Sequence, residues 1–384
     1  MDFKKIDPGA RFVVISDDPT ETELQHGVRS IRGGGGTRRR LRRFLEIMTA
    51  DLFILGGGGI LCSYGGSDQS LTAWLAPLHL AHALGLPTMT WGIGIGDELT
   101  IRGGEAMKQT LEEADSICVR DQRSAARLDQ IGIRKKVTLT ADPALLLPEG
   151  SPTDASQHSV NSPPKVFVFV RHWYVSENRI RDLSKWREFE GSLAACLDSL
   201  ISERSAEVCF IPMRIKDPVD DDRVIAREIS QIMVKGKTVK IVDQTVSSSE
   251  LVHLIAQGDL VIGMRLHSLI AAATMGVPSI AINYHPKVRS FMESVGAGKW
   301  VFEIGDPDGS SQLLNAAREA LSGRYPREEV LAEVDNLRAL AHLNTSIATK
   351  LLHDDSFARG KFRRVIHAIP ILTSRTIEAV RRHD

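Results

Sequence analysis

Residues 259–268, Asp-Leu-Val-Ile-Gly-Met-Arg-Leu-His-Ser, join an apolar run to a polar segment. The run Leu260–Gly263 is short and apolar throughout, which indicates a parallel strand covered on both faces. Arg265 and His267 come directly after it, and a helix-compatible segment follows. A second apolar run, Ser279–Ile282, begins after that segment, so this stretch has the strand–helix–strand order of a doubly wound α/β fold.

The same alternation extends through most of the chain. Short apolar, β-branched runs alternate with longer segments that carry apolar residues at helical spacing. A first series of predicted strands is Arg11–Ser16, Leu52–Leu55, Thr88–Trp91, Ser116–Val119 and Val137–Thr140. A second series is Val166–Val170, Val208–Ile211, Val239–Val242, Leu260–Gly263 and Ser279–Ile282. Two parallel sheets between helix layers follow, and they predict two Rossmann-like doubly wound domains that face a cleft.

Chain length agrees with two domains. The chain has 384 residues, and at ~150 residues per domain two are favoured over one. The segment between the two series of strands is small, polar and interrupted by prolines, which is typical of a linker. We therefore predict an N-terminal domain at 1–150, a linker at 151–164, a C-terminal domain at 165–325, and C-terminal helices with a basic amphipathic tail at 326–384.

Charge and cysteine content restrict the class of protein. The 48 Lys and Arg residues balance 48 Asp and Glu residues, and a formal net charge of zero argues against a nucleic-acid partner. The four cysteines are scattered without metal-ligand spacing, which indicates reduced thiols and no metal site. We find neither an apolar signal core nor a run of ~18 apolar residues. A cytoplasmic protein is expected.

Two segments that follow predicted strands are candidates for lining the cleft. Gly57, Gly58 and Gly59 belong to a run of four glycines after a strand, where the backbone can turn sharply and present N–H groups to an anion. A tight structural turn is the alternative for this run. Arg171 and Trp173 follow the first strand of the second series, where they can supply charge and a surface for sugar stacking.

A group of cationic and titratable side chains forms the strongest candidate site. Arg265 and His267 follow one strand, and Lys287 follows the next one. Because adjacent parallel strands bring such loops side by side, we expect these three residues to form one cationic pocket. Arg120 ends a strand of the first series, where a basic residue suits phosphate or carboxylate binding. His267 is the one group here with an ordinary pKa near 7, so it is the candidate proton donor, with phosphate binding as the alternative.

These motifs resemble the polysaccharide pyruvyl transferase family. The matching blocks are Asp51–Leu61, Gly92–Asp97, Ser116–Ala126, Ala141–Leu147 and Asp259–Lys287. Together they extend over nearly all of the chain from Arg11 to about Gly305. The resemblance implies a fold like glycosyltransferase type B. It also implies a transferase that moves the pyruvyl group of phosphoenolpyruvate onto a sugar of a cell-surface polysaccharide or of its lipid-linked precursor.

The resemblance further implies that phosphoenolpyruvate contacts Arg120, Arg265, His267 and Lys287, and that no other cofactor is required. Phosphoenolpyruvate carries about three negative charges at neutral pH, and several fixed cations match that charge. The expected product is a cyclic pyruvate ketal, with release of phosphate. Two alternative functions stay open: a nucleotide-sugar-dependent glycosyltransferase of the same fold, and a truncated, non-catalytic binding protein.

Three further predictions concern the N-terminus, a basic run and the C-terminal tail. The family usually opens with a strand and a Gly-Asn-x-Gly-Asp-Glu loop, whereas Arg11–Ser16 resembles its second strand, so we expect the first N-terminal strand to be missing through truncation or divergence. The basic run Arg38–Arg43 is interpreted as a solvated helix face. Residues 357–384 mix arginines with apolar residues, and they either contact the inner face of an anionic membrane peripherally or pack on the protein.

Overall fold

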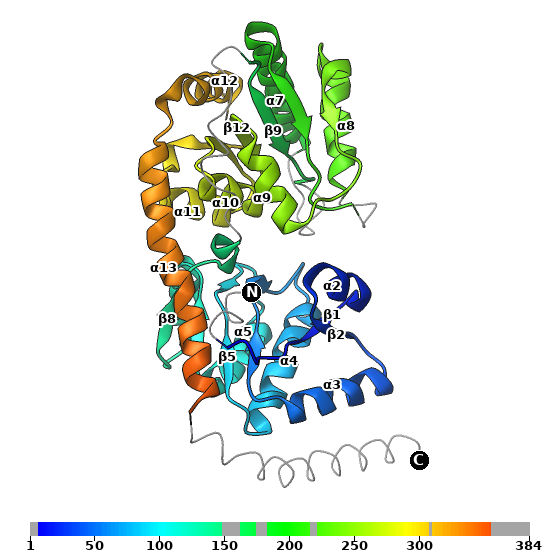
Figure 1. Cartoon of the computed structure of the whole chain (residues 1–384), viewed down its shortest axis with the longest axis vertical. Helices are drawn as coiled ribbons and strands as arrows, with labels where there is room; N and C mark the ends of the chain where they lie inside the picture. Colours follow the sequence, from blue (N-terminus) through cyan, green and yellow to red (C-terminus); the bar gives the residue numbers. More distant parts are fainter. Residues whose placement is uncertain (1–6, 148–161, 174–182, 216–220, 307–308, 355–384) are drawn as a thin grey trace. The chain divides into compact units, whose positions relative to one another are not determined.

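The computed structural model describes residues 7–147, 162–173, 183–215, 221–306 and 309–354. The chain forms two compact units, Met1–Pro143 with Ala339–Asp384 and Ala144–Arg338 (Figure 1). Helix α13 (Arg327–Leu352) contributes residues to both units, so the chain returns to the first unit within this helix. The observed limits therefore differ from the predicted domain ends at 150 and 325. Most of the predicted linker, 151–161, and the whole tail, 357–384, lie outside the described residues.

The second unit contains a parallel sheet, which has six strands within the described residues, in the order β11-β10-β9-β12-β13-β14. The strands are β9 (Lys165–Phe169), β10 (Glu207–Phe210), β11 (Lys240–Ile241), β12 (Leu260–Gly263), β13 (Ser279–Asn283) and β14 (Val301–Glu303). The helices are α7 (Leu183–Arg204), α8 (Asp222–Ile232), α9 (Ser248–Ala256), α10 (Leu266–Thr274), α11 (Pro286–Ser294) and α12 (Gly309–Glu319). The first five strands confirm the sequence prediction, whereas the short strand β14 was not predicted.

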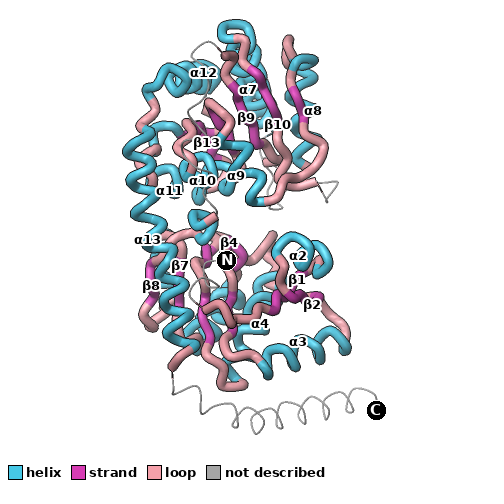
Figure 2. Tube along the Cα trace, in the orientation of Figure 1, coloured by secondary structure: helices cyan, strands magenta, loops and turns pink. Residues whose placement is uncertain are grey.

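The first unit is also α/β, but its pairing is divided among three groups of parallel strands in the described residues. These are β1 (Val13–Ser16) with β2 (Arg29–Arg32), β3 (Phe53–Leu55) with β5 (Thr88–Thr90), and β4 (Gly58–Leu61), β6 (Ile93–Ile95), β7 (Ile117–Val119) and β8 (Val137–Leu139). The helices are α2 (Pro19–His26), α3 (Thr37–Thr49), α4 (Gln69–Ala83), α5 (Ile101–Glu113) and α6 (Gln122–Ile131). Figure 2 shows these strands and helices along the chain.

The glycine run does not form the predicted turn, because two of its members lie in a strand. Gly58 and Gly59 belong to β4, and Gly58 is paired with Ile93 of β6. The pairing of β3 with β5 thus continues as the pairing of β4 with β6 after a break at the glycines. Gly58 lies opposite Ile93, and the register then shifts so that Leu61 lies opposite Ile95. A Cβ on Gly57 would lie 3.2 Å from the carbonyl oxygen of Trp91 and 3.0 Å from a side-chain carbon of Pro143. Close packing of neighbouring segments therefore explains the glycine at this position.

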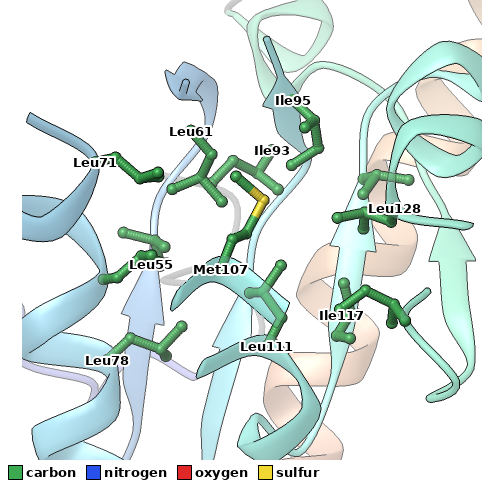
Figure 3. Packing of buried hydrophobic residues seen from close by; sticks show 13 residues of the cluster. Leu55, Leu61, Leu71, Leu78, Ile93, Ile95, Met107, Leu111, Ile117 and Leu128 are labelled. Carbon is green, nitrogen blue, oxygen red and sulfur yellow. The ribbon is translucent and has the colours of Figure 1, made fainter. Parts of the chain in front are cut away.

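Packing between the sheet and two helices forms the core of the first unit. Leu61 and Ile93 from the strands meet Leu71 of α4, and Met107 of α5, in one buried cluster (Figure 3). Burial of each such side chain contributes roughly 1.5–3 kcal/mol to the free energy of unfolding. On the other side, Ala348 in the last turns of α13 packs against strands β5 and β7. The strands are consequently covered on both faces, and β5 and β7 are buried along their whole length.

One carboxyl group on α7 of the second unit gives a test of these packing contacts. Partial burial, and then the nearby charge of Glu228 on α8, raise the pKa of Glu190 to about 6. Ionisation therefore opposes folding, and this loss of stability develops as the pH rises from the ordinary pKa of 4.5 through 6. After allowance for solvent screening, Glu190→Gln should increase the free energy of unfolding by ~1 kcal/mol at pH 7.5 and leave it unchanged at pH 4.

Chemical denaturation at the two pH values measures this effect. Glu188→Gln, at an exposed position on the same helix, is the matched control. Equal effects of the two substitutions on the free energy of unfolding at pH 7.5 would contradict the raised pKa of Glu190.

Candidate functional site

The carboxyl ends of three neighbouring strands in the second unit carry most of the predicted site residues. Strand β12 is paired with β9 on one side and with β13 on the other, and all three are parallel. Arg171 follows β9, Arg265 and His267 follow β12, and Lys287 follows β13. The fold therefore places these four side chains in successive loops at one edge of a single sheet.

Tyr284 contacts two of these cations. The residue is buried, with 6% of its surface exposed. The guanidinium carbon of Arg171 lies 5.0 Å from the centre of the Tyr284 ring, and the Nζ of Lys287 lies 5.4 Å from it. Nη1 of Arg171 also donates a long hydrogen bond, 3.4 Å, to the phenolic oxygen. Because a cation is attracted to the face of an aromatic ring, Tyr284 holds both positive groups near each other.

The charges around Tyr284 change its acidity. Burial of the phenol by itself acts to raise its pKa, because the charged form loses hydration. The positive charges of Lys287 and Arg171, together with hydrogen bonds to both, act in the opposite direction and are stronger in sum. The pKa of Tyr284 is therefore lowered from its ordinary value of 10.0. This shift indicates a local positive potential at the site, which favours binding of an anion.

Arg265 is held by a buried carboxylate. Asp222, the first residue of α8, is 2% exposed, and its Oδ2 accepts a hydrogen bond from Nε of Arg265 at 3.2 Å. Nη2 of Arg265 forms an ion pair with the other carboxylate oxygen. The backbone N–H groups of Met213 and Arg214 donate to the same Oδ2, at 2.9 and 3.0 Å. Asp222 therefore fixes both the loop after β10 and the guanidinium after β12.

His267 and Lys287 begin two helices. His267 lies on the first turn of α10 and is exposed, so its imidazole is accessible to solvent. Lys287 is the second residue of α11, and its backbone N–H donates to Nδ1 of His285 at 3.3 Å. The N-termini of both helices therefore lie at the same sheet edge as the cationic side chains. Helix N-termini carry unpaired N–H groups and partial positive charge, so they add to the attraction for an anion.

Trp173 packs within the second unit. Its ring lies 6.4 Å from the ring of Trp186 on α7, with 29° between the ring planes. Trp186 in turn contacts Phe189 and is itself buried. Stacking of Trp173 on a sugar in the cleft therefore remains a prediction, and the observed contact is with an aromatic row on α7.

Arg120 belongs to the first unit and is enclosed by carboxylates and glycines. Its Nη1 donates to the buried Asp142 at 2.7 Å, and its Nε lies 3.4 Å from Asp121. A Cβ on Gly94 would lie 2.8 Å from Nε of Arg120, and one on Gly59 would lie 3.4 Å from its Nη2. The two glycines therefore leave room for the guanidinium, which is 7% exposed. This packing gives Gly59 a structural role, whereas acceptor binding by Gly57–Gly59 stays a prediction.

The residues predicted to bind phosphoenolpyruvate differ in whether a carboxylate already neutralises their positive charge. Arg120 and Arg265 each form an ion pair with a buried carboxylate. In the part of the chain that the structure describes, no carboxylate forms such a pair with Lys287, whose ammonium lies over the Tyr284 ring. Lys287 therefore offers the positive charge that an incoming anion can use at the least electrostatic cost.

Sequence reasoning missed the partners of these cations. Tyr284 stands directly before the His285-Pro286-Lys287 motif, and Asp142 lies in the Ala-Asp-Pro block, so both were close to recognised signals. Asp222 closes a run of three aspartates in the sequence. Asp221, directly before it, caps α8 by accepting a hydrogen bond from the backbone N–H of Arg223.

Metal binding and membrane spanning are each tested by one observation. Across the described ranges, no group of three or more His, Cys, Asp and Glu side chains is placed to hold a metal ion. Over the same residues, no helix is long and apolar enough to cross a bilayer. The expectations of no metal, no cofactor and a cytoplasmic location remain predictions.

Comparison with known proteins gives a family match. A model of the polysaccharide pyruvyl transferase family matches residues 2–286. The chain is also 24% identical, over 243 residues, to the amylovoran biosynthesis protein AmsJ of Erwinia amylovora. That match covers 59% of this chain and 58% of AmsJ, so the chain spans little more than half the length of this curated relative.

Solved structures with the same fold include an epimerase and a protein in complex with UDP. The UDP-GlcNAc 2-epimerase of Methanocaldococcus jannaschii aligns with a TM-score of 0.56 and 12% identity, over 89% of this chain and 95% of the epimerase. HepE of Anabaena in complex with UDP aligns with a TM-score of 0.53 and 15% identity, over 92% of this chain and 93% of HepE. These similarities confirm the predicted glycosyltransferase type B architecture with two Rossmann-like units.

Proposed function

Because the chain belongs to the polysaccharide pyruvyl transferase family, we propose that it transfers the pyruvyl group of phosphoenolpyruvate to a sugar of a cell-surface polysaccharide or of its lipid-linked precursor. The product is a cyclic pyruvate ketal, and phosphate is released. The observation that carries this proposal is the sheet edge of the second unit, where Arg171, Arg265, His267 and Lys287 occupy successive loops. Such a group of fixed cations suits a donor with a phosphate and a carboxylate.

The proposed reaction forms two C–O bonds and breaks one. A proton adds to C3 of phosphoenolpyruvate, which becomes the methyl group and leaves C2 electrophilic. One hydroxyl oxygen of the sugar then bonds to C2. A second hydroxyl oxygen bonds to C2 as the C2–O bond to phosphate breaks. The two hydroxyl protons balance the proton at C3 and the proton taken up by the leaving phosphate.

In our proposal, the side chains of the second unit have different roles in this reaction. Lys287 and Arg171, which both lie over the Tyr284 ring, bind anionic groups of the donor. Arg265, aligned by Asp222, offers a planar guanidinium that suits a carboxylate or a phosphate. His267 supplies the proton, because its imidazole is exposed on the first turn of α10 and histidine is the side chain that most often acts as a general acid.

Lys287 provides a direct test of donor binding. Lys287→Met removes the charge but keeps an unbranched apolar stem against Tyr284. We expect the dissociation constant for phosphoenolpyruvate, measured by calorimetry, to rise by roughly 10- to 100-fold, since a charge-assisted hydrogen bond contributes ~1.5–3 kcal/mol.

Lys299→Met is the matched control for this substitution. The Lys299 ammonium also lies over an aromatic ring of the second unit, 5.7 Å from the centre of Trp300. It is exposed and lies away from the strand ends described above. Equal affinities of the Lys287 and Lys299 variants for phosphoenolpyruvate would remove Lys287 from the donor site.

Ligand-induced stabilisation separates this function from a nucleotide-sugar-dependent transferase. A ligand that binds the folded protein raises the melting temperature in proportion to the logarithm of its concentration over its dissociation constant. We expect phosphoenolpyruvate to raise the melting temperature and UDP and GDP to leave it unchanged. Stabilisation by UDP or GDP alone would favour the nucleotide-sugar reaction.

A further inference from the structure

Helix α3 exposes leucines among its arginines. The helix carries five arginines, Arg38, Arg39, Arg40, Arg42 and Arg43. Leu41 is 51% exposed and Leu45 is 46% exposed, although the helix also has an inward face that packs well. Residues 38–42 of the basic run are exposed, as predicted for a solvated helix face, and Leu41 and Leu45 share this exposure.

The inward face of α3 is formed by other residues. Ile47 is buried, and Phe44 and Met48 pack with it against Ala81, Leu84 and Leu86 at the end of α4 and just beyond it. Leu41 and Leu45 are one helical turn apart, and Arg38 and Arg42 are related to them by steps of three. The exposed leucines therefore form a stripe that is bordered by arginines and is not used to hold the helix on the protein.

The charge around this stripe is strongly positive. Glu46 is the one acidic residue of α3, and it pairs with Arg29 on β2. Arg32, at the end of β2, is exposed as well. Figure 2 shows α3 at the periphery of the first unit, next to β2 and α4. This part of the surface thus combines an apolar stripe with an excess of guanidinium groups.

We propose that α3 is an interfacial helix that docks the first unit on the surface of an anionic phospholipid bilayer. Guanidinium groups of α3 bind lipid phosphates, and Leu41 and Leu45 enter the boundary between headgroups and acyl chains. The exposed leucines favour a bilayer over a nucleic acid, whose phosphate backbone offers arginines a partner but offers leucines none. The inference is independent of the proposed reaction, and it concerns a segment different from residues 357–384.

Vesicle flotation with the full chain tests this docking. The probes are vesicles of phosphatidylcholine alone and vesicles that also contain phosphatidylglycerol. We expect binding to the anionic vesicles only, with a strong decrease at high salt. Arg38→Gln with Arg42→Gln should weaken the partition roughly 10- to 30-fold. Leu41→Gln with Leu45→Gln should weaken it by about tenfold, because the apolar contact is lost.

Matched controls use exposed residues of the second unit. Arg187→Gln with Arg204→Gln changes two exposed arginines of α7, and Ile232→Gln with Val234→Gln changes two exposed apolar residues at the end of α8. These pairs should leave vesicle binding unchanged. An unchanged partition of both α3 variants would overturn the proposal, whichever other segment binds lipid. A second outcome would also overturn the proposal, in favour of a surface that binds any polyanion. In that outcome, the arginine pair lowers vesicle binding and the leucine pair does not, and the protein binds single-stranded RNA as tightly as it binds anionic vesicles.

Discussion

Replacement of His267 by glutamine is expected to lower the rate of phosphate release ~10²–10⁴-fold at saturating phosphoenolpyruvate, while affinity for phosphoenolpyruvate changes little. Glutamine keeps a hydrogen-bond donor of similar size but has no titratable proton. His267 is exposed on the first turn of α10, so its side chain can be exchanged without disturbing the core. The measurement is phosphate release in the presence of a pyranose with free 4- and 6-hydroxyls or an equatorial vicinal diol.

The pH profile identifies the role of the imidazole. One limb of the profile should be present in the wild-type protein and absent from the glutamine variant. His253→Gln is the control, because His253 is an exposed histidine of the same unit on α9. If affinity falls and the saturated rate holds, His267 is a phosphate ligand and the proton comes from elsewhere.

Replacement of Asp222 by alanine is expected to cause the largest loss of stability, ~3–5 kcal/mol in the free energy of unfolding. Removal of one partner of a buried ion pair leaves the other charge without compensation, which accounts for a loss of that size. Two backbone N–H groups, of Met213 and Arg214, also lose their acceptor. Affinity for phosphoenolpyruvate should fall as well, because Arg265 loses the carboxylate that orients its guanidinium.

The neighbouring aspartate gives the control for this substitution. Asp221 caps α8, and its side chain is only slightly exposed. Its carboxylate forms an ion pair with Arg223, whereas Asp222 pairs with Arg265. Loss of such a cap costs ~1 kcal/mol. Equal destabilisation by Asp221→Ala and Asp222→Ala in urea denaturation would show that Asp222 acts only as part of the helix start.

Strands were predictable from the sequence where they consist of a continuous run of apolar residues. Two examples are Leu260–Gly263 and Lys165–Phe169, which are buried along nearly their whole length and correspond to apolar runs in the sequence. Gly58–Leu61 and Ile93–Ile95 were missed because their glycines suggest turns. Their strand conformation follows from pairing with each other, across a register shift between Gly58 and Leu61. Such a tertiary constraint has no local signal in the sequence.

The site was predictable as a set of strand ends and unpredictable as a set of contacts. Parallel neighbours in one sheet bring the loops after β9, β12 and β13 to the same edge, and this rule needs only the strand order. Arg265 and Asp222, in contrast, are 43 residues apart and meet because β10 and β12 flank β9. Such long-range pairs decide whether a cation is already neutralised by a carboxylate. The sequence alone therefore did not show that Arg265 has a carboxylate partner whereas Lys287 lacks one among the described residues.

Mass spectrometry of the acceptor distinguishes pyruvyl transfer from glycosyl transfer. A pyranose acceptor is incubated with the protein and phosphoenolpyruvate, and released phosphate is measured in parallel. We expect the acceptor to gain C₃H₂O₂, the composition of a cyclic pyruvate ketal, with one phosphate released for each product, and we expect Lys287→Met to lower both together. An acceptor that stays unchanged with phosphoenolpyruvate but gains a hexose from a UDP- or GDP-sugar would contradict the proposed pyruvyl transfer.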